Sequence, residues 1–161
     1  MKAARVTLAP FVVWDAGLWW ALATDPRVRA NLGGVLPVWP RMKAFARDVK
    51  SARRGNLWCA RAHCRKIGLV YLVPTSEPGT LALSYLFRAD VWGKGLASEA
   101  VALVLQTAQQ RFPDARIVAE TQAANVRSRQ LLAGQGFVET ARLTRFGAEQ
   151  ICFEWRGARP G

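Results

Sequence analysis

Histidine and cysteine are scarce in this chain of 161 residues. The single histidine, His63, is the only residue that could serve a mechanism based on a His–carboxylate pair. Cys59, Cys64 and Cys152 are too few and too irregularly spaced for a disulfide framework, and they favour reduced thiols in the cytoplasm. Although Cys59, His63 and Cys64 lie near one another, no fourth ligand follows at zinc-finger spacing, so we expect no bound metal.

Long apolar runs are also missing. No stretch has the length needed to span a bilayer, so we expect no membrane partner. Two basic residues followed by the apolar stretch 8–23 imitate a secretory signal that ends in an A-x-A pattern. Pro10 and Asp15 interrupt that stretch, however, and the same residues suit a strand followed by an amphipathic helix. Both interpretations stay open, and the folded one is preferred.

Acidic residues are outnumbered, because 11 Asp and Glu stand against 23 Lys and Arg, a formal net charge of +12. Such an excess steers polyanions toward the surface, and a ribosome or another anionic partner is one explanation. A solvated basic surface, or one that serves only a phosphorylated cofactor, explains the charge equally well. The basic residues form no tail. Electrostatic repulsion disfavours polycations such as aminoglycosides as substrates.

The length and composition of the chain predict a single domain over residues 1–161. An apolar share of 51% with 21% charged residues argues against disorder, and no repeat or linker divides the chain. Apolar periodicity and turn residues predict strands at 4–9, 56–62, 67–73, 81–87, 115–121, 137–146 and 150–156, and helices at 14–24, 26–32, 40–53, 95–111 and 125–133. This order predicts a mixed α/β domain.

The segment DVWGKGLASEA (90–100) places two glycines and a lysine between a strand and a helix. Free N–H groups and the dipole at a helix N-terminus attract anions. Gly93 and Gly95 leave room for a phosphate against the main chain, while Lys94 and Arg88 add positive charge. The spacing fits neither a P-loop nor a complete dinucleotide fingerprint. By itself, the segment indicates either an anion site or a simple turn.

Two longer segments carry a family resemblance. SYLFRADVWGKGLASEAVALVL (84–105) resembles the cofactor-binding segment of the GNAT family of acyl-CoA N-acyltransferases, with the pattern [QR]-x-x-G-x-[GA]. Trp92 takes the first place of that pattern. NVRSRQLLAGQGF (125–137) resembles the N-x-x-S-x-x-x-L-x-x-x-G-F segment of the branch that contains the ribosomal-protein-alanine N-acetyltransferases, and the start of the chain is a looser match.

The resemblance implies a single GNAT-like α/β domain over 1–161. Its central sheet would be mixed and mostly antiparallel, with about seven strands, flanking helices and a splayed edge between the fourth and fifth strands. The implied activity is acetyl transfer from acetyl-CoA to a primary amine by direct attack, with the N-terminus of a ribosomal or other protein as one acceptor. A cytoplasmic monomer or homodimer without a metal is expected. The alternatives are a non-catalytic basic module that binds RNA or the ribosome, and a small-molecule amine acetyltransferase.

The resemblance also implies cofactor contacts. Main-chain N–H groups of the turn would hold the pyrophosphate, the strand end would bond the pantetheine amides, Asn125 would bind the pantetheine arm, and Arg129 would reach a phosphate. The expected cofactor-binding residues are Leu86, Phe87, Arg88, Trp92, Gly93, Lys94, Gly95, Leu96, Ala97, Asn125, Ser128 and Arg129. Asn125 is also a preferred helix N-cap, which would explain it without a ligand. The segment 14–39 would roof the acceptor cleft.

The catalytic residues are the least determined part of this prediction. By resemblance, Ser128 would lie near the sulfur and protonate the leaving thiolate, although a plain surface hydroxyl is the alternative. An ammonium with a pKa near 10 must also lose a proton before it attacks. The strand 81–87 carries no carboxylate, and the tyrosine that many GNAT enzymes place in the short helix is Leu132 here. Glu120 and Glu149 are therefore the candidate bases, with a water relay as the alternative.

Overall fold

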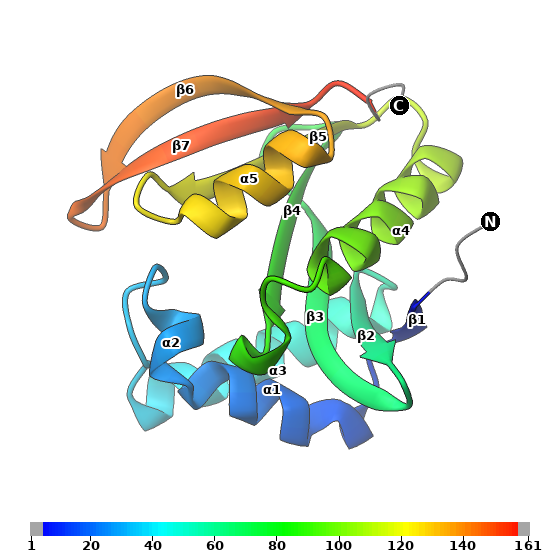
Figure 1. The fold of residues 1–161 in the computed structure, drawn as a ribbon, viewed down its shortest axis with the longest axis vertical. Helices are drawn as coiled ribbons and strands as arrows, with labels where there is room; N and C mark the ends of the chain where they lie inside the picture. Colours follow the sequence, from blue (N-terminus) through cyan, green and yellow to red (C-terminus); the bar gives the residue numbers. More distant parts are fainter. Residues whose placement is uncertain (1–4, 158–161) are drawn as a thin grey trace.

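A computed structural model describes residues 5–157, which form one seven-stranded sheet with helices on both faces (Figure 1). The strands are β1 (Val6–Pro10), β2 (Leu57–Ala62), β3 (Arg65–Pro74), β4 (Thr80–Phe87), β5 (Arg116–Gln122), β6 (Phe137–Arg145) and β7 (Ala148–Trp155). The helices are α1 (Ala16–Thr24), α2 (Pro26–Arg29), α3 (Val38–Arg53), α4 (Leu96–Arg111) and α5 (Val126–Gly134), with short 3-10 turns η1 (Val13–Asp15) and η2 (Ala89–Val91). The α/β fold predicted from the sequence is confirmed.

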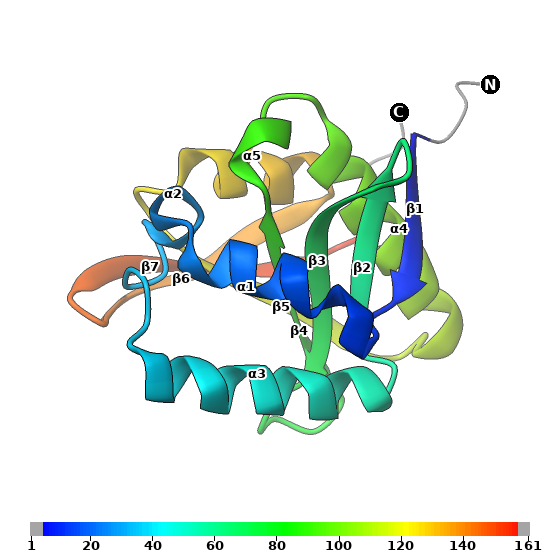
Figure 2. The ribbon, with the colours of Figure 1, turned by 90° about the horizontal axis from the view of Figure 1, so that it is seen from below.

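Two cores lie on opposite faces of the sheet. On one face, α4 and α5 cover the strands, and Val101, Val104 and Leu132 are buried there. On the other face, α1 and α3 pack on β2 and β3 around Trp19 and Leu69. Figure 2 shows α3 and α5 on opposite sides of the sheet. Each of these four helices therefore has one side that packs on the sheet and one side that faces outward.

The strand order is β1-β2-β3-β4-β5-β7-β6, and only β4 and β5 run parallel. β3 and β4 pair along almost their whole length, from Gly68 opposite Phe87 to Pro74 opposite Leu81. The pairing of β4 with β5, in contrast, covers only Thr80–Ala82 before the strands diverge. The splayed edge that the resemblance implied is therefore present, and it opens along the second half of β4.

The two outer strands of the sheet differ in how they are protected. β1 is short, and Val6 at its start is buried against α4. β6 has mostly exposed side chains and a register shift between Glu139 and Ala141 where it pairs with β7. Arg142 on β6 contacts the carboxylates of Glu139 and Glu149. The free side of β6 is therefore irregular and charged.

Several element boundaries differ from the sequence-based prediction. Helix α2 ends at Arg29 rather than near residue 32, and α3 begins at Val38 rather than Pro40, because proline is tolerated in a first helical turn. The hairpin between β2 and β3 has a two-residue turn, with His63 and Cys64 both at positive φ, so β3 begins at Arg65, two residues earlier than expected.

The signal-like segment forms β1 and α1, and Leu18 and Leu22 of α1 lie in the core. The folded interpretation of this segment is therefore the one that the structure supports. Over residues 5–157, none of the helices combines the length and the apolar character needed to cross a bilayer.

Candidate functional site

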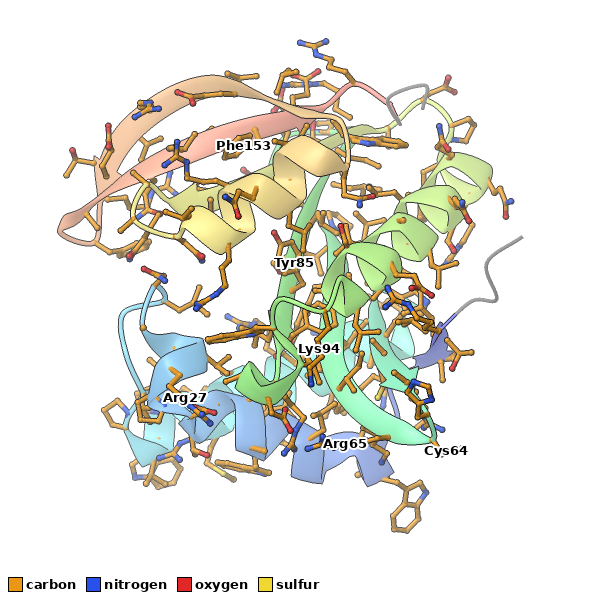
Figure 3. All side chains as sticks on the ribbon, viewed as in Figure 1. Arg27, Cys64, Arg65, Tyr85, Lys94 and Phe153 are labelled. Carbon is orange, nitrogen blue, oxygen red and sulfur yellow. The ribbon has the colours of Figure 1, made fainter. Side chains whose placement is uncertain are left out.

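A cleft of about 170 Å³ opens where β4 and β5 diverge. One wall is the second half of β4, from Leu83 to Phe87, and the other is formed by β5 and the first turns of α5. Arg27 of α2, together with Asn31 and Leu32 of the following loop, lines its lower side. Figure 3 shows Tyr85 pointing into the space between α4 and α5, with Lys94 and Arg27 below it. The cleft is thus built from both parts of the split sheet.

The turn between η2 and α4 borders the cleft and presents main chain rather than side chains. Gly93 and Gly95 have φ values of 72° and 74°, a left-handed conformation that glycine adopts without strain. Gly95 is the N-cap of α4 and no side chain caps the helix, while the space beside the Cα atom of Gly93 is open. Lys94 Nζ donates to the carbonyl oxygen of Asp90 at 2.9 Å. An anion can therefore reach the N–H groups of this turn.

Arg5 and Glu99 stabilise the turn through hydrogen bonds. Arg5 Nη1 donates to the carbonyl oxygen of Lys94 at 3.2 Å, and Glu99 Oε1 accepts from the backbone N–H groups of Arg5 and Val6 at 2.6 Å and 2.9 Å. Desolvation opposes ionisation of Glu99, but these hydrogen bonds hold its pKa below the ordinary value. The start of β1 is thereby attached to the first turn of α4.

Trp92 and Arg127 connect the turn to α5. The indole Nε1 of Trp92 donates to the carbonyl oxygen of Phe87 at 3.1 Å, which fixes the ring at the end of β4. The guanidinium carbon of Arg127 lies 4.5 Å from the centre of that ring, within cation–π range. This contact crosses the mouth of the cleft from one wall to the other.

Asn125, Ser128 and Tyr85 form a short hydrogen-bonded chain inside the cleft. Asn125 Oδ1 caps α5 by accepting from the N–H of Ser128 at 3.2 Å. The hydroxyl oxygens of Ser128 and Tyr85 lie 2.8 Å apart. Burial raises the pKa of Tyr85 to about 12, against the opposing effect of its bond to Ser128. Tyr85 therefore keeps its proton and can donate it to Ser128 Oγ, which leaves the serine proton free to point into the cleft.

The two candidate bases lie in different surroundings. Glu120 lines the cleft, and its Oε2 contacts Arg145 Nη1 at 3.2 Å. Glu149 is not among the lining residues; its half-exposed carboxylate lies 3.5 Å from Arg142. The structure thus brings Glu120 into the cleft with Ser128 and leaves Glu149 on the outer hairpin.

The other predicted site residues divide into three groups. Leu86, Phe87, Trp92, Ala97, Asn125 and Ser128 line the cleft. Arg88, Gly93, Lys94, Gly95 and Leu96 belong to the bordering segment, where Arg88 Nε points to Asp90 at 3.4 Å. Arg129 turns away and donates to the carbonyl oxygen of Ala123 at 3.1 Å. The structure therefore gathers most of the set around one opening.

Sequence reasoning missed Tyr85 and the contribution of α2. The alternation along β4 could have indicated Tyr85, because Leu83 and Phe87 on the same face are buried against α4 and α5. From the segment 14–39, Arg27, Val28, Asn31 and Leu32 line the cleft, whereas its tryptophans do not. Trp19 is buried and bonded to Asp48, and Trp39 is exposed.

Metal-ligating side chains do not cluster anywhere in residues 5–157. The polar side chains that line the cleft are hydroxyls, amides, one carboxylate, one indole and the guanidinium groups of Arg27 and Arg127. These groups suit hydrogen bonding and proton transfer to an organic ligand.

Comparisons with known proteins agree with this geometry. Residues 5–138 match the model of the acetyltransferase (GNAT) domain. No curated protein matches the chain significantly. Among solved structures, a GNAT-family acetyltransferase from Bacillus anthracis is 17% identical, with a TM-score of 0.78 and 96% of each chain covered.

Two further similar structures are of proteins named for their activities. The ribosomal-protein-alanine N-acetyltransferase from Brucella melitensis is 19% identical, with a TM-score of 0.74, and the alignment covers 92% of this chain and 98% of that one. The spermidine N-acetyltransferase from Vibrio cholerae, solved with CoA and spermine, is 14% identical, with a TM-score of 0.78 and coverages of 93% and 94%. At these identities the likeness shows a shared fold.

Proposed function

The chain belongs to the acetyltransferase (GNAT) family, and we propose that it transfers an acetyl group from acetyl-CoA to a primary amine. The observation that carries this proposal is the split between β4 and β5, which ends at an uncapped helix N-terminus. An edge of β4 without a strand partner suits an amide-containing arm, and the N-terminus of α4 suits a phosphate. Both parts of the donor would therefore be held in one continuous cleft.

The residues present fit acetyl-CoA. The donor carries about four negative charges at neutral pH, as phosphate ionisation dictates. Lys94 and Arg127 lie at the cleft, and neither of them pairs with a carboxylate in residues 5–157. The open space beside Gly93 would admit a phosphate oxygen to the main chain. The spermidine N-acetyltransferase of the same fold was solved with CoA, which supports this assignment.

Acetyl-CoA supplies an activated acyl carbon and a thiolate leaving group. In the reaction, the amine nitrogen forms a bond to that carbon, the C–S bond breaks, one proton leaves the amine and one reaches the sulfur. Ser128 would provide the second proton, and Tyr85 would hold the serine hydroxyl in position by donating to its oxygen. Because the pKa of Tyr85 is about 12, this donor persists over the working pH range.

Glu120 is the base we assign, acting directly or through a water. Of the two candidate bases, Glu120 is the one that lines the cleft, and its contact with Arg145 holds the carboxylate in place. A backbone N–H of β4 beyond Ala82 would donate to the developing oxyanion, because that edge has no strand partner. The reaction then needs no histidine.

The ion pairs of the molecule indicate which class of acceptor it favours. In residues 5–157, every carboxylate except Asp114 contacts a basic side chain. A polyamine or an aminoglycoside would therefore find no unpaired carboxylate in the cleft to replace its water shell, because Asp114 does not line it. A protein amino terminus, in contrast, brings a single charge. We accordingly propose a protein amino terminus as the acceptor class.

Calorimetry and an acceptor screen test this function. The protein should bind acetyl-CoA saturably, and mass spectrometry should show a 42-Da gain, the mass of an added acetyl group, on peptides with a free amino terminus in preference to spermidine. Peptides that are already acetylated serve as the control. Preference for spermidine would overturn the acceptor assignment, and the absence of acetyl-CoA binding would overturn the function itself.

A further inference from the structure

The basic residues without a carboxylate partner fall into two separate groups. Across residues 5–157 they are Arg29, Arg41, Lys43, Lys50, Arg53, Arg54, Lys94, Arg111, Arg127 and Arg129. Lys94 and Arg127 lie at the cleft, where a phosphorylated donor accounts for them, and Arg129 lies in the same turn of α5 as Arg127 but donates to the carbonyl oxygen of Ala123. Most of the others lie on α3 or directly after it. The cofactor does not explain this second group.

The outward stripe of α3 carries cations at helical spacing. Lys43, Arg47, Lys50 and Arg54 are all exposed and follow one another at intervals of four, three and four residues. Side chains at such intervals are neighbours about 5–6 Å apart, so the stripe extends over roughly 16 Å. Arg53 is exposed beside them. The result is a regular row of positive charge.

No exposed acid interrupts this row. The one acidic residue of the helix, Asp48, is buried, where it accepts hydrogen bonds from Trp19 Nε1 at 2.8 Å and Tyr71 Oη at 3.1 Å. Its second oxygen contacts Arg47 Nε at 3.4 Å, so Arg47 is the one cation of the row with a carboxylate partner. Arg111 at the end of α4 donates to the carbonyl oxygen of Gly55 at 3.3 Å, which adds another cation beyond the end of α3. Charge of one sign thus continues past the helix.

An aromatic ring marks the other end of the row. Trp39 is 77% exposed in the first turn of α3, one helical turn before Lys43. Neighbouring cations with an exposed aromatic are the combination that binds single-stranded nucleic acids, because bases stack on the ring while phosphates meet the cations. Figure 2 shows α3 on the face of the sheet opposite α5, and none of the residues that line the cleft belongs to α3. The two surfaces can therefore act independently.

We propose that the outer face of α3, formed by Trp39, Lys43, Arg47, Lys50, Arg53 and Arg54, is a docking surface for single-stranded nucleic acid. Phosphates contact the cations, and a base stacks on Trp39. A membrane is disfavoured because Ala44, Phe45 and Val49 of α3 pack into the core, and the exposed apolar side chains of the helix, Val38, Trp39 and Met42, are confined to its first two turns. This surface is separate from acetyl transfer and does not depend on it.

Fluorescence anisotropy with a labelled single-stranded 20-nucleotide RNA tests the proposal. The triple variant Lys43→Gln, Lys50→Gln, Arg53→Gln should bind on the order of 100-fold more weakly at 0.1 M salt, because each lost phosphate contact removes about 0.7 from the salt slope. Trp39→Ala should weaken binding by about tenfold through lost stacking. Acetyl-CoA affinity and the unfolding midpoint should not change in either variant, because the altered residues are exposed and remote from the cleft.

A charge-matched control distinguishes RNA binding at a specific site from general attraction by the net charge. The triple variant Arg65→Gln, Arg116→Gln, Arg156→Gln lowers the formal charge by the same three units on other surfaces, and it should retain RNA binding within about threefold. Equal losses in both triple variants would overturn the proposal. So would binding of phosphatidylserine vesicles or polyglutamate at least as tight as that of the RNA, or RNA binding that excess acetyl-CoA displaces.

Discussion

The two edges of β4 differ in their pairing, because one is bonded to a neighbouring strand along its length and the other is mostly open. Toward β3, the strand is paired from Leu81 to Phe87 and its backbone groups are satisfied within the sheet. Toward β5, pairing stops at Ala82 and the rest of the strand borders a cleft. One strand therefore contributes stability through one edge and binding capacity through the other, and substitutions on the two sides should have separable effects.

The largest effect is expected on the closed side, at Gly68 of β3. A Cβ atom there would lie 2.2 Å from the Phe87 ring and 2.6 Å from the carbonyl oxygen of Leu86. Gly68→Val should lower the free energy of unfolding by about 3 kcal/mol, because the strand must shift to admit the side chain. Urea unfolding measures the change. Gly17→Ala in α1 is the control, because the added Cβ atom would meet nothing within 4 Å. This variant should raise the free energy of unfolding by roughly 0.5–1 kcal/mol.

The next largest effect is expected where the open side ends, at Gly95. Gly95→Asp places a carboxylate against the phosphate position in a left-handed conformation, and acetyl-CoA affinity should fall on the order of 100-fold, about 2.7 kcal/mol. Titration calorimetry measures the loss. Gly95→Ala carries the backbone strain without the charge and should lose less. Equal losses in the two variants would show that backbone shape, rather than charge, governs binding.

Within the cleft, Ser128→Ala should reduce kcat by about tenfold with little change in acetyl-CoA affinity. This is less than the roughly 10²–10⁴-fold of general acid catalysis, because water can also protonate the thiolate. Tyr85→Phe should have a smaller effect in the same direction, because it removes the bond that orients the serine hydroxyl. Steady-state kinetics with both variants separate kcat from KM. A normal kcat in Ser128→Ala would remove this residue from the mechanism.

Tyr85 also predicts how stability depends on pH. Its pKa is about 12 in the folded protein against 10 for an ordinary tyrosine, so the folded state keeps a proton that the unfolded state releases between these values. Stability should therefore fall as the pH rises above 10, by about 1 kcal/mol at pH 11. Tyr85→Phe should remove that part of the decline, while the buried Tyr71, whose pKa is also raised, retains its own. Urea unfolding at pH 9 and pH 11 decides this, and equal declines in the two proteins would contradict it.

The smallest effect is expected at the contact that crosses the cleft mouth. Arg127→Ala removes the cation–π contact with Trp92 and one cation near the donor, so acetyl-CoA affinity should fall about threefold, with faster dissociation. Arg127→Lys keeps the charge and should recover part of the loss. Stopped-flow measurement of the dissociation rate is the appropriate readout, and an unchanged rate in Arg127→Ala would show that the contact does not retain the donor.

Local patterns predicted most of this fold. The glycine-flanked turn, the apolar spacing of α4 and the alternation of the strands are properties of neighbouring residues, and each lies within a few positions of its predicted place. The partners across the split sheet were beyond such patterns. Tyr85 meets Ser128 only because β4 and α5, distant in sequence, converge, and no spacing rule places Glu120 in the cleft while Glu149 stays outside. Likewise, composition could not divide the positive charge between the cleft and α3.

The irregular outer strand β6 determines how the sheet meets other molecules. A sheet grows into a fibril when a straight edge offers evenly spaced N–H and C=O groups to an incoming chain. The register shift at Glu139 and Ala141 interrupts that spacing, and charged side chains such as Arg142 must lose water before another strand can approach. Edge-to-edge growth is therefore suppressed on this side. At high concentration, the protein should remain free of fibrils for reasons that its net charge alone would not provide.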